Sequence, residues 1–105
     1  MNILFVCSMA RFRSRTAAMC LKAAWNEVRY RGTDVDADIR VCEDDLVWAD
    51  VIVCMENNHR NKLRRKWKGY SQKMQVWSIT DIYGLLDDEL VHKLKVKSEN
   101  LLEML

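Results

Sequence analysis

Residues that interrupt helices and strands are almost missing from this sequence. The 105 residues include no proline and three glycines, Gly32, Gly69 and Gly84. Because glycine and proline mark most turns and loops, we expect helices and strands joined by short connections. The length is that of one domain and predicts a single domain over residues 1–105.

The amino-acid composition excludes several classes of protein. Hydrophobic residues make up 50% of the chain, charged residues 30%, and the net charge is +2. A chain this apolar and this weakly charged is not intrinsically disordered. No apolar run approaches the ~20 residues that a membrane-spanning helix needs. We therefore expect a soluble globular protein that has no membrane partner.

The cysteines indicate reduced thiols and no metal site. They lie far apart in the sequence, at Cys7, Cys20, Cys42 and Cys54. The N-terminal apolar run ends at Val6, which is too short for the core of a signal peptide. Disulfides are mainly a feature of secreted proteins, so we predict free thiols and a cytoplasmic location. Zinc is not predicted, since no two cysteines have ligand spacing and His59 and His92 are distant from each other.

Short apolar segments alternate with segments of helical pattern. Segments typical of strands are residues 3–6, 28–31, 51–55 and 74–79. Segments typical of helices are residues 14–24, a short turn at 45–50, a helix to Trp67 that Asn57 or Asn58 can cap, and a final helix that Asp87 or Asp88 can cap. This alternation predicts an α/β fold, a three-layer sandwich around a four-stranded parallel sheet.

Leucines and alanines at helical spacing indicate which helix faces are buried. In the first helix the repeating residues are Ala17, Leu21, Ala24 and Trp25. In the last helix they are Leu90, Leu94, Leu101, Leu102 and Leu105. We expect both stripes to pack on the sheet.

One helix is strongly basic. Residues 59–68 contain six Lys or Arg, no acid, and Trp67. A basic segment with an aromatic residue can bind nucleic acid. The spacing of Leu63 and Trp67 instead favours a solvated helix face with these two side chains turned inward, so nucleic acid is not predicted as a partner.

Two strands are followed by cysteine and arginine in the same spacing, at Cys7–Arg13 and Cys54–Arg60. Ligands of parallel α/β sheets bind beyond the carboxyl ends of the strands, so both loops are candidates. The second loop carries Glu56, which would repel a phosphate. The residue after its arginine is Asn61, whereas the first loop has the hydroxyl of Ser14 at that position. We therefore discard it and expect Cys54, like Cys20, to be a core thiol.

The first loop suits a phosphate and a nucleophilic thiolate. It joins a strand to a helix N-terminus, where backbone N–H groups and the helix dipole favour anions. Cysteines in such places ionise readily. The planar fork of Arg13 can hold two phosphate oxygens, and the Ser14 hydroxyl can donate to the thiolate. Arg11 and Arg15 add positive charge.

Five segments together resemble a known family over most of the chain. They are residues 3–7 with Arg13-Ser14, residues 28–33, residues 48–56 with His59-Arg60, residues 81–84, and residues 87–90. In that order, they are similar to five parts of the low-molecular-weight protein tyrosine phosphatases: the first strand with the phosphate loop, the second strand, the third strand with the start of the next helix, the acid-bearing loop, and the last helix. The resemblance implies a flavodoxin-like topology and a short member of that family.

The resemblance also implies a mechanism. Cys7 would attack phosphorus to form a phosphocysteine, with Arg13 holding the phosphate and Asp81, or else Asp87, acting as general acid. Phosphate would be bound by the loop residues Ser8, Met9, Ala10, Arg11, Phe12, Arg13 and Ser14. Tyr83 would form a substrate wall. Phosphorylated protein or a small aryl phosphate is the implied substrate, inorganic phosphate the product, and no metal or organic cofactor is implied.

Three departures from the family pattern keep alternatives open. Met9 and Ala10 stand where the family has Gly and Asn, and Phe12 replaces a cysteine that forms a protective disulfide in many members. One alternative is a catalytically weak or inactive module that binds phosphate or phosphoprotein. Another is a phosphocarrier similar to sugar-phosphotransferase IIB subunits, which begin with the same strand and Cys-Ser but have no need of Arg13.

Overall fold

Parallel strands form one central sheet in the computed structural model, which describes residues 1–21 and 27–103. The spatial order of the strands is β2-β1-β3-β4, and every neighbouring pair is parallel. Their bounds are β1 Asn2–Cys7, β2 Glu27–Gly32, β3 Val51–Cys54 and β4 Met74–Val76. The predicted four-stranded parallel sheet is confirmed.

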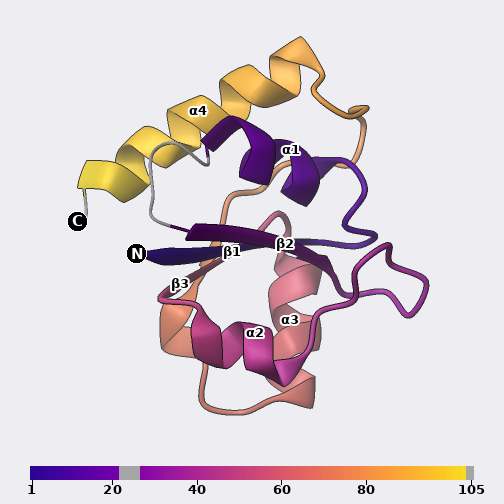
Figure 1. Ribbon diagram of the computed structural model, residues 1–105, viewed down its shortest axis with the longest axis vertical. Helices are drawn as coiled ribbons and strands as arrows, with labels where there is room; N and C mark the ends of the chain where they lie inside the picture. Colours follow the sequence, from indigo (N-terminus) through magenta and orange to yellow (C-terminus); the bar gives the residue numbers. More distant parts are fainter. Residues whose placement is uncertain (22–26, 104–105) are drawn as a thin grey trace.

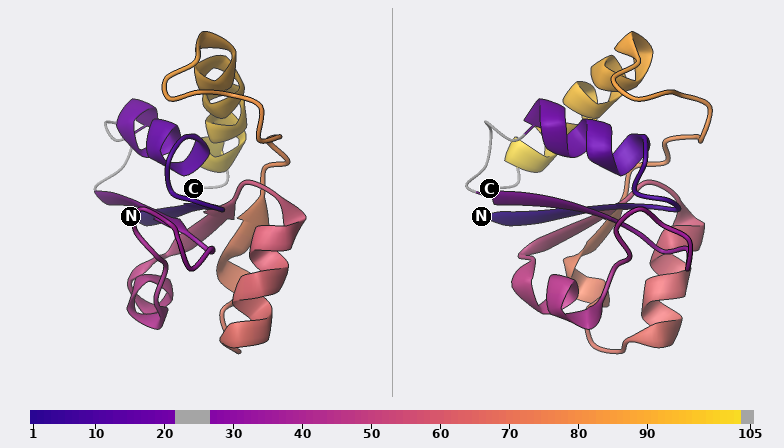
Figure 2. Two further views of the ribbon diagram at one scale, coloured as in Figure 1. Left: turned by 90° about the vertical axis from the view of Figure 1, so that its right-hand side faces the viewer. Right: turned by 45° about the vertical axis from the view of Figure 1, so that its right-hand side comes forward.

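Helices cover both faces of the sheet and complete the predicted three layers (Figure 1). Their bounds are α1 Arg13–Leu21, α2 Glu43–Trp48, α3 Asn57–Lys66 and α4 Asp88–Glu103, with a short 3₁₀ turn, η2, at Ser71–Lys73. Figure 2 shows α1 and α4 together on one face and α2 and α3 on the other. Among the described residues, no helix combines the length and the apolar character that crossing a bilayer requires.

The central strand β1 is buried on both sides. Ile3, Leu4, Phe5 and Val6 are all fully buried. Successive strand residues point to opposite faces, so Ile3 and Phe5 join the core under α1 and α4, whereas Leu4 and Val6 join the core over α2 and α3. This position explains why the segment is a continuous apolar run rather than an alternating one.

The predicted apolar stripes of the helices are confirmed where they are described. Leu21, Leu90 and Leu94 lie in the core between α1, α4 and the sheet, and Leu63 lies in the core on the other face. Trp67 is half-buried against that second core. The predicted positions Ala24 and Trp25 and the side chains of Leu101, Leu102 and Leu105 fall outside the described residues.

Several predicted boundaries differ from the structure by one to three residues, for instance the turn at 45–50, which is α2, and two of the differences have a clear cause. The fourth strand ends at Val76 instead of residue 79, because Ser78 adopts a left-handed backbone with φ +56° that an extended strand cannot contain. Helix α3 is preceded by Glu56 as its extended cap residue, not by Asn57 or Asn58. The backbone N–H of Glu56 donates to the His59 ring, which closes the first turn of the helix.

The cap of the last helix is confirmed as Asp87. Its carboxylate accepts the backbone N–H groups of Glu89 at 2.9 Å and Leu90 at 3.3 Å. These are the first unpaired N–H groups of the helix, which an aspartate at this position usually satisfies.

The order of the strands opens a crevice at their carboxyl ends. From β1 the chain passes through α1 to β2 on one side, then returns to β3 on the other side of β1. The loops after β1 and β3 consequently leave toward opposite faces of the sheet (Figure 2). Such a switch point is where open parallel sheets bind their ligands.

Candidate active site

The loop after β1 is held so that its carbonyl groups face outward. The carbonyl oxygens of Cys7, Ser8 and Met9 accept backbone N–H groups from Thr33, Asp34 and Asp38 at 2.9–3.0 Å. The negative ends of these peptide dipoles therefore point away from the hollow that the loop encloses. A loop turned in this way favours an anion inside it.

Ala10 gives the loop its tight curvature. It has a left-handed backbone with φ +57° and is fully buried. An L-residue pays roughly 1–2 kcal/mol for this conformation, so the surrounding contacts must hold it in place. One of them comes from Gly32 at the end of β2, whose missing Cβ would lie 2.6 Å from the Ser8 carbonyl oxygen and 2.9 Å from the Ala10 nitrogen.

The nucleophile candidate lies at the base of the hollow. Cys7 is 3% exposed, and its Sγ is 3.1 Å from Oγ of the fully buried Ser14. Ser14 belongs to the first turn of α1, so the positive end of the helix dipole and the hydroxyl both act on the sulfur. A helix N-terminus and a hydroxyl are both groups that bind anions.

Arg13 lies among three oxygen acceptors brought in from elsewhere in the chain. Its side chain is 2% exposed. Its Nη1 donates to the Ile79 carbonyl at 2.8 Å and forms an ion pair with the Glu56 carboxylate. Its Nε is 3.7 Å from Oδ1 of Asp81. These partners fix the plane of the guanidinium, as a two-oxygen grip on a phosphate requires.

Sequence reasoning missed the role of Glu56. The sequence predicts only that its charge would repel a phosphate from the Cys54–Arg60 loop, whereas the structure places it beside the Cys7–Arg13 loop. The signal that could have found it is its position directly after β3, the neighbour of β1 in the sheet. Carboxyl ends of adjacent parallel strands meet at one edge, so Glu56 and Arg13 are neighbours in space.

The hollow itself is small and bordered by Asp81. Its volume is about 70 Å³, and its lining residues are Cys7, Ser8, Met9, Arg11, Phe12, Arg13 and Asp81. A water molecule occupies ~30 Å³ of liquid, so the hollow suits an ion of a few atoms. The structure thus brings the predicted nucleophile, arginine and acid together. The Asp81 side chain is 60% exposed at the rim, whereas the Asp87 carboxylate caps α4.

Arg11 lies at the rim but is paired. Its guanidinium donates to both carboxylate oxygens of Asp38, at 3.0 and 3.3 Å. This hydrogen bond holds the pKa of Asp38 below its ordinary value and raises the pKa of Arg11. The pair ties the loop after β1 to the segment after β2.

His59 is a second residue at the loop, and the family resemblance included it without giving it a role. It is fully buried, and its Nδ1 accepts the Glu56 backbone N–H at 3.0 Å. Burial lowers the pKa of His59 to about 4, helped by the positive charge of Arg13, so the ring is neutral at pH 7. A neutral ring that accepts at Nδ1 carries its proton on Nε2, which therefore donates to Ser8 Oγ at 2.9 Å. This leaves the Ser8 hydroxyl proton free for an anion in the hollow.

The buried neutral ring predicts a loss of stability in acid. The pKa of His59 is about 4 in the fold and about 6.5 when unfolded, so its contribution is complete above pH 6.5 and falls as the pH drops. Between pH 7 and pH 4 the free energy of unfolding should fall by about 3 kcal/mol more in wild type than in His59→Gln. Urea unfolding of both proteins at several pH values measures this difference.

Exposed His92 on α4 supplies the control for that experiment. We expect His92→Gln to keep the pH dependence of the wild type. Parallel pH profiles for wild type and His59→Gln would contradict the assignment of a buried neutral ring.

The structure separates the two cysteine-arginine motifs. Cys54 is fully buried in the core under α2 and α3, and burial raises the pKa of its thiol to about 12. It therefore stays protonated at neutral pH, in keeping with the predicted core thiol. Cys20 is half-buried against the core on the other face, which also agrees with the prediction.

Tyr83 does not lie at the hollow, in contrast to the predicted substrate wall. Its side chain is 6% exposed and packs in the core between α1 and α4. Its hydroxyl donates to Glu89 at 3.3 Å and accepts from Lys93, which holds the ring away from the site. Phe12 is the aromatic side chain that lines the hollow, and it is 39% exposed.

Among the residues in 1–21 and 27–103, no three His, Cys, Asp or Glu side chains are grouped to hold a metal ion. No known family model matches the sequence, and no curated protein sequence matches it.

Solved structures do match. The tyrosine phosphatase Wzb from Escherichia coli K30, in complex with phosphate, superposes with a TM-score of 0.81 over 99% of this chain and 97% of its own, at 19% identity. A low-molecular-weight protein tyrosine phosphatase from T. tengcongensis gives 0.77 over 100% and 99%, at 20% identity. The YwlE arginine phosphatase from Geobacillus stearothermophilus gives 0.75 over 98% and 94%, at 19% identity.

The chain has the low-molecular-weight protein tyrosine phosphatase fold. In this phosphatase fold the strand order β2-β1-β3-β4 is the predicted flavodoxin-like topology. The similarity extends over nearly the whole chain although about one residue in five is identical. Shape is retained because the layered core requires hydrophobic residues at buried positions and not particular ones.

Proposed function

We propose that the protein is a cysteine-dependent phosphatase that hydrolyses phosphotyrosine or other aryl phosphate monoesters, with residues 1–105 acting as one catalytic domain. The observation that carries this proposal is the arrangement of Cys7, Arg13 and Asp81 around one hollow of about 70 Å³. A nucleophile, a phosphate-binding cation and an acid are the three groups that the reaction needs.

In the proposed reaction the Cys7 thiolate attacks phosphorus, and a sulfur–phosphorus bond forms as the bond to the leaving oxygen breaks. Asp81 donates its proton to that oxygen, so that a neutral phenol leaves. Water then attacks the phosphocysteine while Asp81 takes its proton. Inorganic phosphate is released and the thiolate is restored. A neighbouring structure supports the covalent step, since a Cys-to-Ser mutant of YwlE has a phosphorylated active-site serine.

In the proposed complex the phosphoryl oxygens are stabilised by Arg13, by the Ser8 hydroxyl and by the side of the loop that faces the hollow. Glu56 and the Ile79 carbonyl orient the guanidinium, and His59 orients Ser8. Phe12 offers an apolar surface at the rim, against which the ring of an aryl phosphate can pack. This apolar neighbour supports an aryl ester rather than a small alkyl ester as the substrate.

Asp81→Asn tests the general acid. We expect turnover of phenyl phosphate to fall by ~10²–10⁴-fold, because a poor leaving group needs a proton from the enzyme. Turnover of an aryl phosphate with a strongly acidic phenol should fall much less. Steady-state rates for the two substrates measure the contrast.

Asp87→Asn is the matched control for this test. Asparagine also caps helices, so this variant should keep both α4 and the activity. If Asp87→Asn rather than Asp81→Asn shows the dependence on leaving group, Asp81 is not the acid.

A further inference from the structure

Helix α3 and the turn after it form a concentrated positive region. Residues 57–80 contain seven Lys or Arg and no Asp or Glu. Six of these cations lie within nine consecutive positions of the sequence: Arg60, Lys62, Arg64, Arg65, Lys66 and Lys68. Throughout the described ranges 1–21 and 27–103, none of the six is in an ion pair with a carboxylate. All of them except the half-buried Arg60 are exposed and available to an outside anion.

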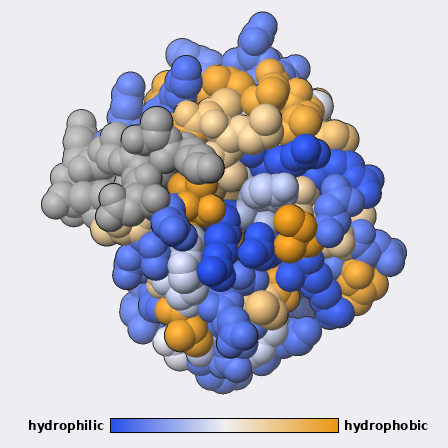
Figure 3. Space-filling model, viewed as in Figure 1, coloured by the Kyte–Doolittle hydropathy of each residue, from blue (hydrophilic) through white to orange (hydrophobic). Residues whose placement is uncertain are grey.

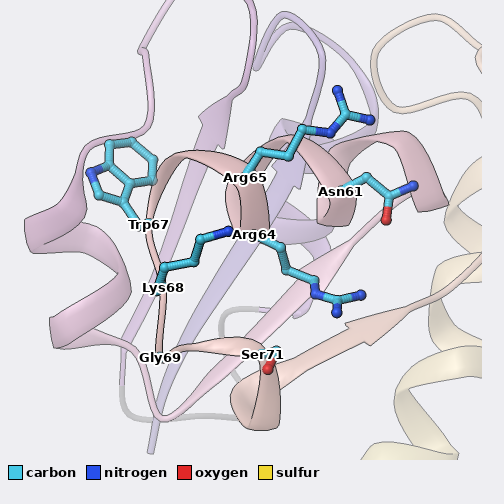
Figure 4. Close-up of a pocket in the computed structure, with 7 residues that line it drawn as sticks. All are labelled: Asn61, Arg64, Arg65, Trp67, Lys68, Gly69 and Ser71. Carbon is cyan, nitrogen blue, oxygen red and sulfur yellow. The ribbon is translucent and has the colours of Figure 1, made fainter.

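A hollow lies at the C-terminal end of α3. Its volume is about 320 Å³, and its lining residues are Asn61, Arg64, Arg65, Trp67, Lys68, Gly69 and Ser71. Figure 4 shows Arg64 and Asn61 extending from the same side of the helix, with Ser71 below them. Arg65 extends toward the top of the view, away from Ser71. Guanidinium, amide and hydroxyl groups together match carboxylate or phosphate oxygens.

A smaller hollow continues this surface toward the candidate active site. It measures about 50 Å³ and is lined by Thr33, Arg40, Val41, Lys62, Leu63, Lys66 and Trp67. Trp67 borders both hollows, and the Thr33 N–H donates to the Cys7 carbonyl. We call the cations Arg40, Lys62, Arg64, Lys66 and Lys68 the basic track. The track runs from behind the phosphate loop to the turn at Gly69.

The environment of Trp67 favours a peptide over a nucleic acid as the occupant. Single-stranded nucleic acids bind by stacking bases on exposed aromatic rings. Trp67 instead packs on the core under α3, and the Lys66 ammonium lies 4.9 Å from the centre of its ring. The track therefore offers charge and hydrogen-bond donors, whereas the ring that borders it, Trp67, is half-buried and lies under the Lys66 ammonium. Hydrophilic residues also cover most of the surface around α2 and α3, in contrast to the region of α1 and α4 (Figure 3).

We propose that the basic track docks an acidic segment of the phosphoprotein substrate, an inference that rests on the proposed phosphatase function. The first turn of α3 contacts the phosphate loop through His59. The ten residues of the helix rise about 15 Å, which an extended peptide covers in about five residues. The acidic segment should accordingly begin about five residues from the phosphorylated one.

Two phosphotyrosine peptides test this proposal. They are identical except that a stretch beginning five residues from the phosphotyrosine is all Glu in one and all Gln in the other. At low salt we expect wild type to prefer the Glu peptide by about tenfold in kcat/KM, because several exposed ion pairs form together. The preference should shrink as salt is added.

Arg64→Glu/Lys68→Glu should abolish this preference. Lys95→Glu/Lys97→Glu on α4 makes the same change in charge at exposed positions away from the track, and it should keep the preference. Both variants should turn over a small aryl phosphate like wild type, which shows that they are folded. Equal peptide preference in the two double variants would overturn the proposal.

Direct binding separates this proposal from the catalytic one. Fluorescence anisotropy of an unphosphorylated Glu peptide requires no turnover, so binding that depends on Arg64 and Lys68 supports docking even if every phosphoester is left uncleaved. A single-stranded oligonucleotide of equal charge serves as competitor. Tighter binding of the oligonucleotide than of the peptide would refute the assignment of a peptide partner.

Discussion

Cys7→Ser is expected to abolish turnover of a chromogenic aryl phosphate, to below about one part in 10⁴ of wild type. The Cys7 sulfur lies at the base of the anion hollow, 3.1 Å from the Ser14 hydroxyl and at the first turn of α1. A serine hydroxyl in its place does not ionise at neutral pH and is a much weaker nucleophile than a thiolate. Initial rates at saturating substrate measure the loss.

Cys54→Ser is the matched control, since it makes the same chemical change in the second cysteine-arginine motif. Cys54 is a fully buried core thiol, so its replacement should cost stability but leave activity near that of wild type. Equal turnover in wild type and Cys7→Ser would sink the enzymatic assignment. Wild type that binds phosphate at this loop without any turnover would favour the alternative of a phosphate-binding module.

Gly32→Ala is expected to disrupt the phosphate loop from behind. An added Cβ would lie 2.5 Å from the Ala37 Cβ, 2.6 Å from the Ser8 carbonyl oxygen and 2.9 Å from the Ala10 nitrogen. Two of these are backbone atoms of the loop, which cannot move without losing its shape. We expect a loss of about 3 kcal/mol in the free energy of unfolding, as for other overpacked sites. Turnover and phosphate affinity should fall as well.

Gly84→Ala separates this steric effect from the general effect of replacing a glycine. No atom lies within 4 Å of a Cβ placed on Gly84. Its free energy of unfolding should change by no more than about 1 kcal/mol, with activity retained. Urea unfolding and titration with inorganic phosphate provide both readouts. If Gly32→Ala behaves like Gly84→Ala, the loop does not depend on close contact with β2.

The parts of the fold that were predictable from sequence are those set by local pattern and burial. Residues 3–6 predict a strand buried on both faces, and β1 is one, because a central strand between two helix layers meets apolar neighbours on each side. Asp87 was one of two predicted caps for the last helix and is the one that binds its free N–H groups.

One difference arises where a contact distant in sequence overrides local preference. Residues 77–79 are apolar enough for a strand, but Ser78 turns left-handed as the chain leaves the sheet. Its neighbour Ile79 then places its carbonyl on Arg13. The cap of α3 differs for a local reason, since the ring of His59, three residues further along the chain, accepts the N–H of Glu56.

The sequence by itself determined the α/β layering and the candidate nucleophile, arginine and hydroxyl of the loop Cys7–Ser14, because these depend on hydrophobic periodicity and on residues close together in the chain. Only the tertiary structure decided which groups surround that loop. It brought Glu56 and His59 to the loop from the start of α3, which follows the neighbouring strand β3, and it buried Tyr83 in the core. The physical reason is that parallel strands align their carboxyl ends at one edge, where residues more than forty positions apart become neighbours.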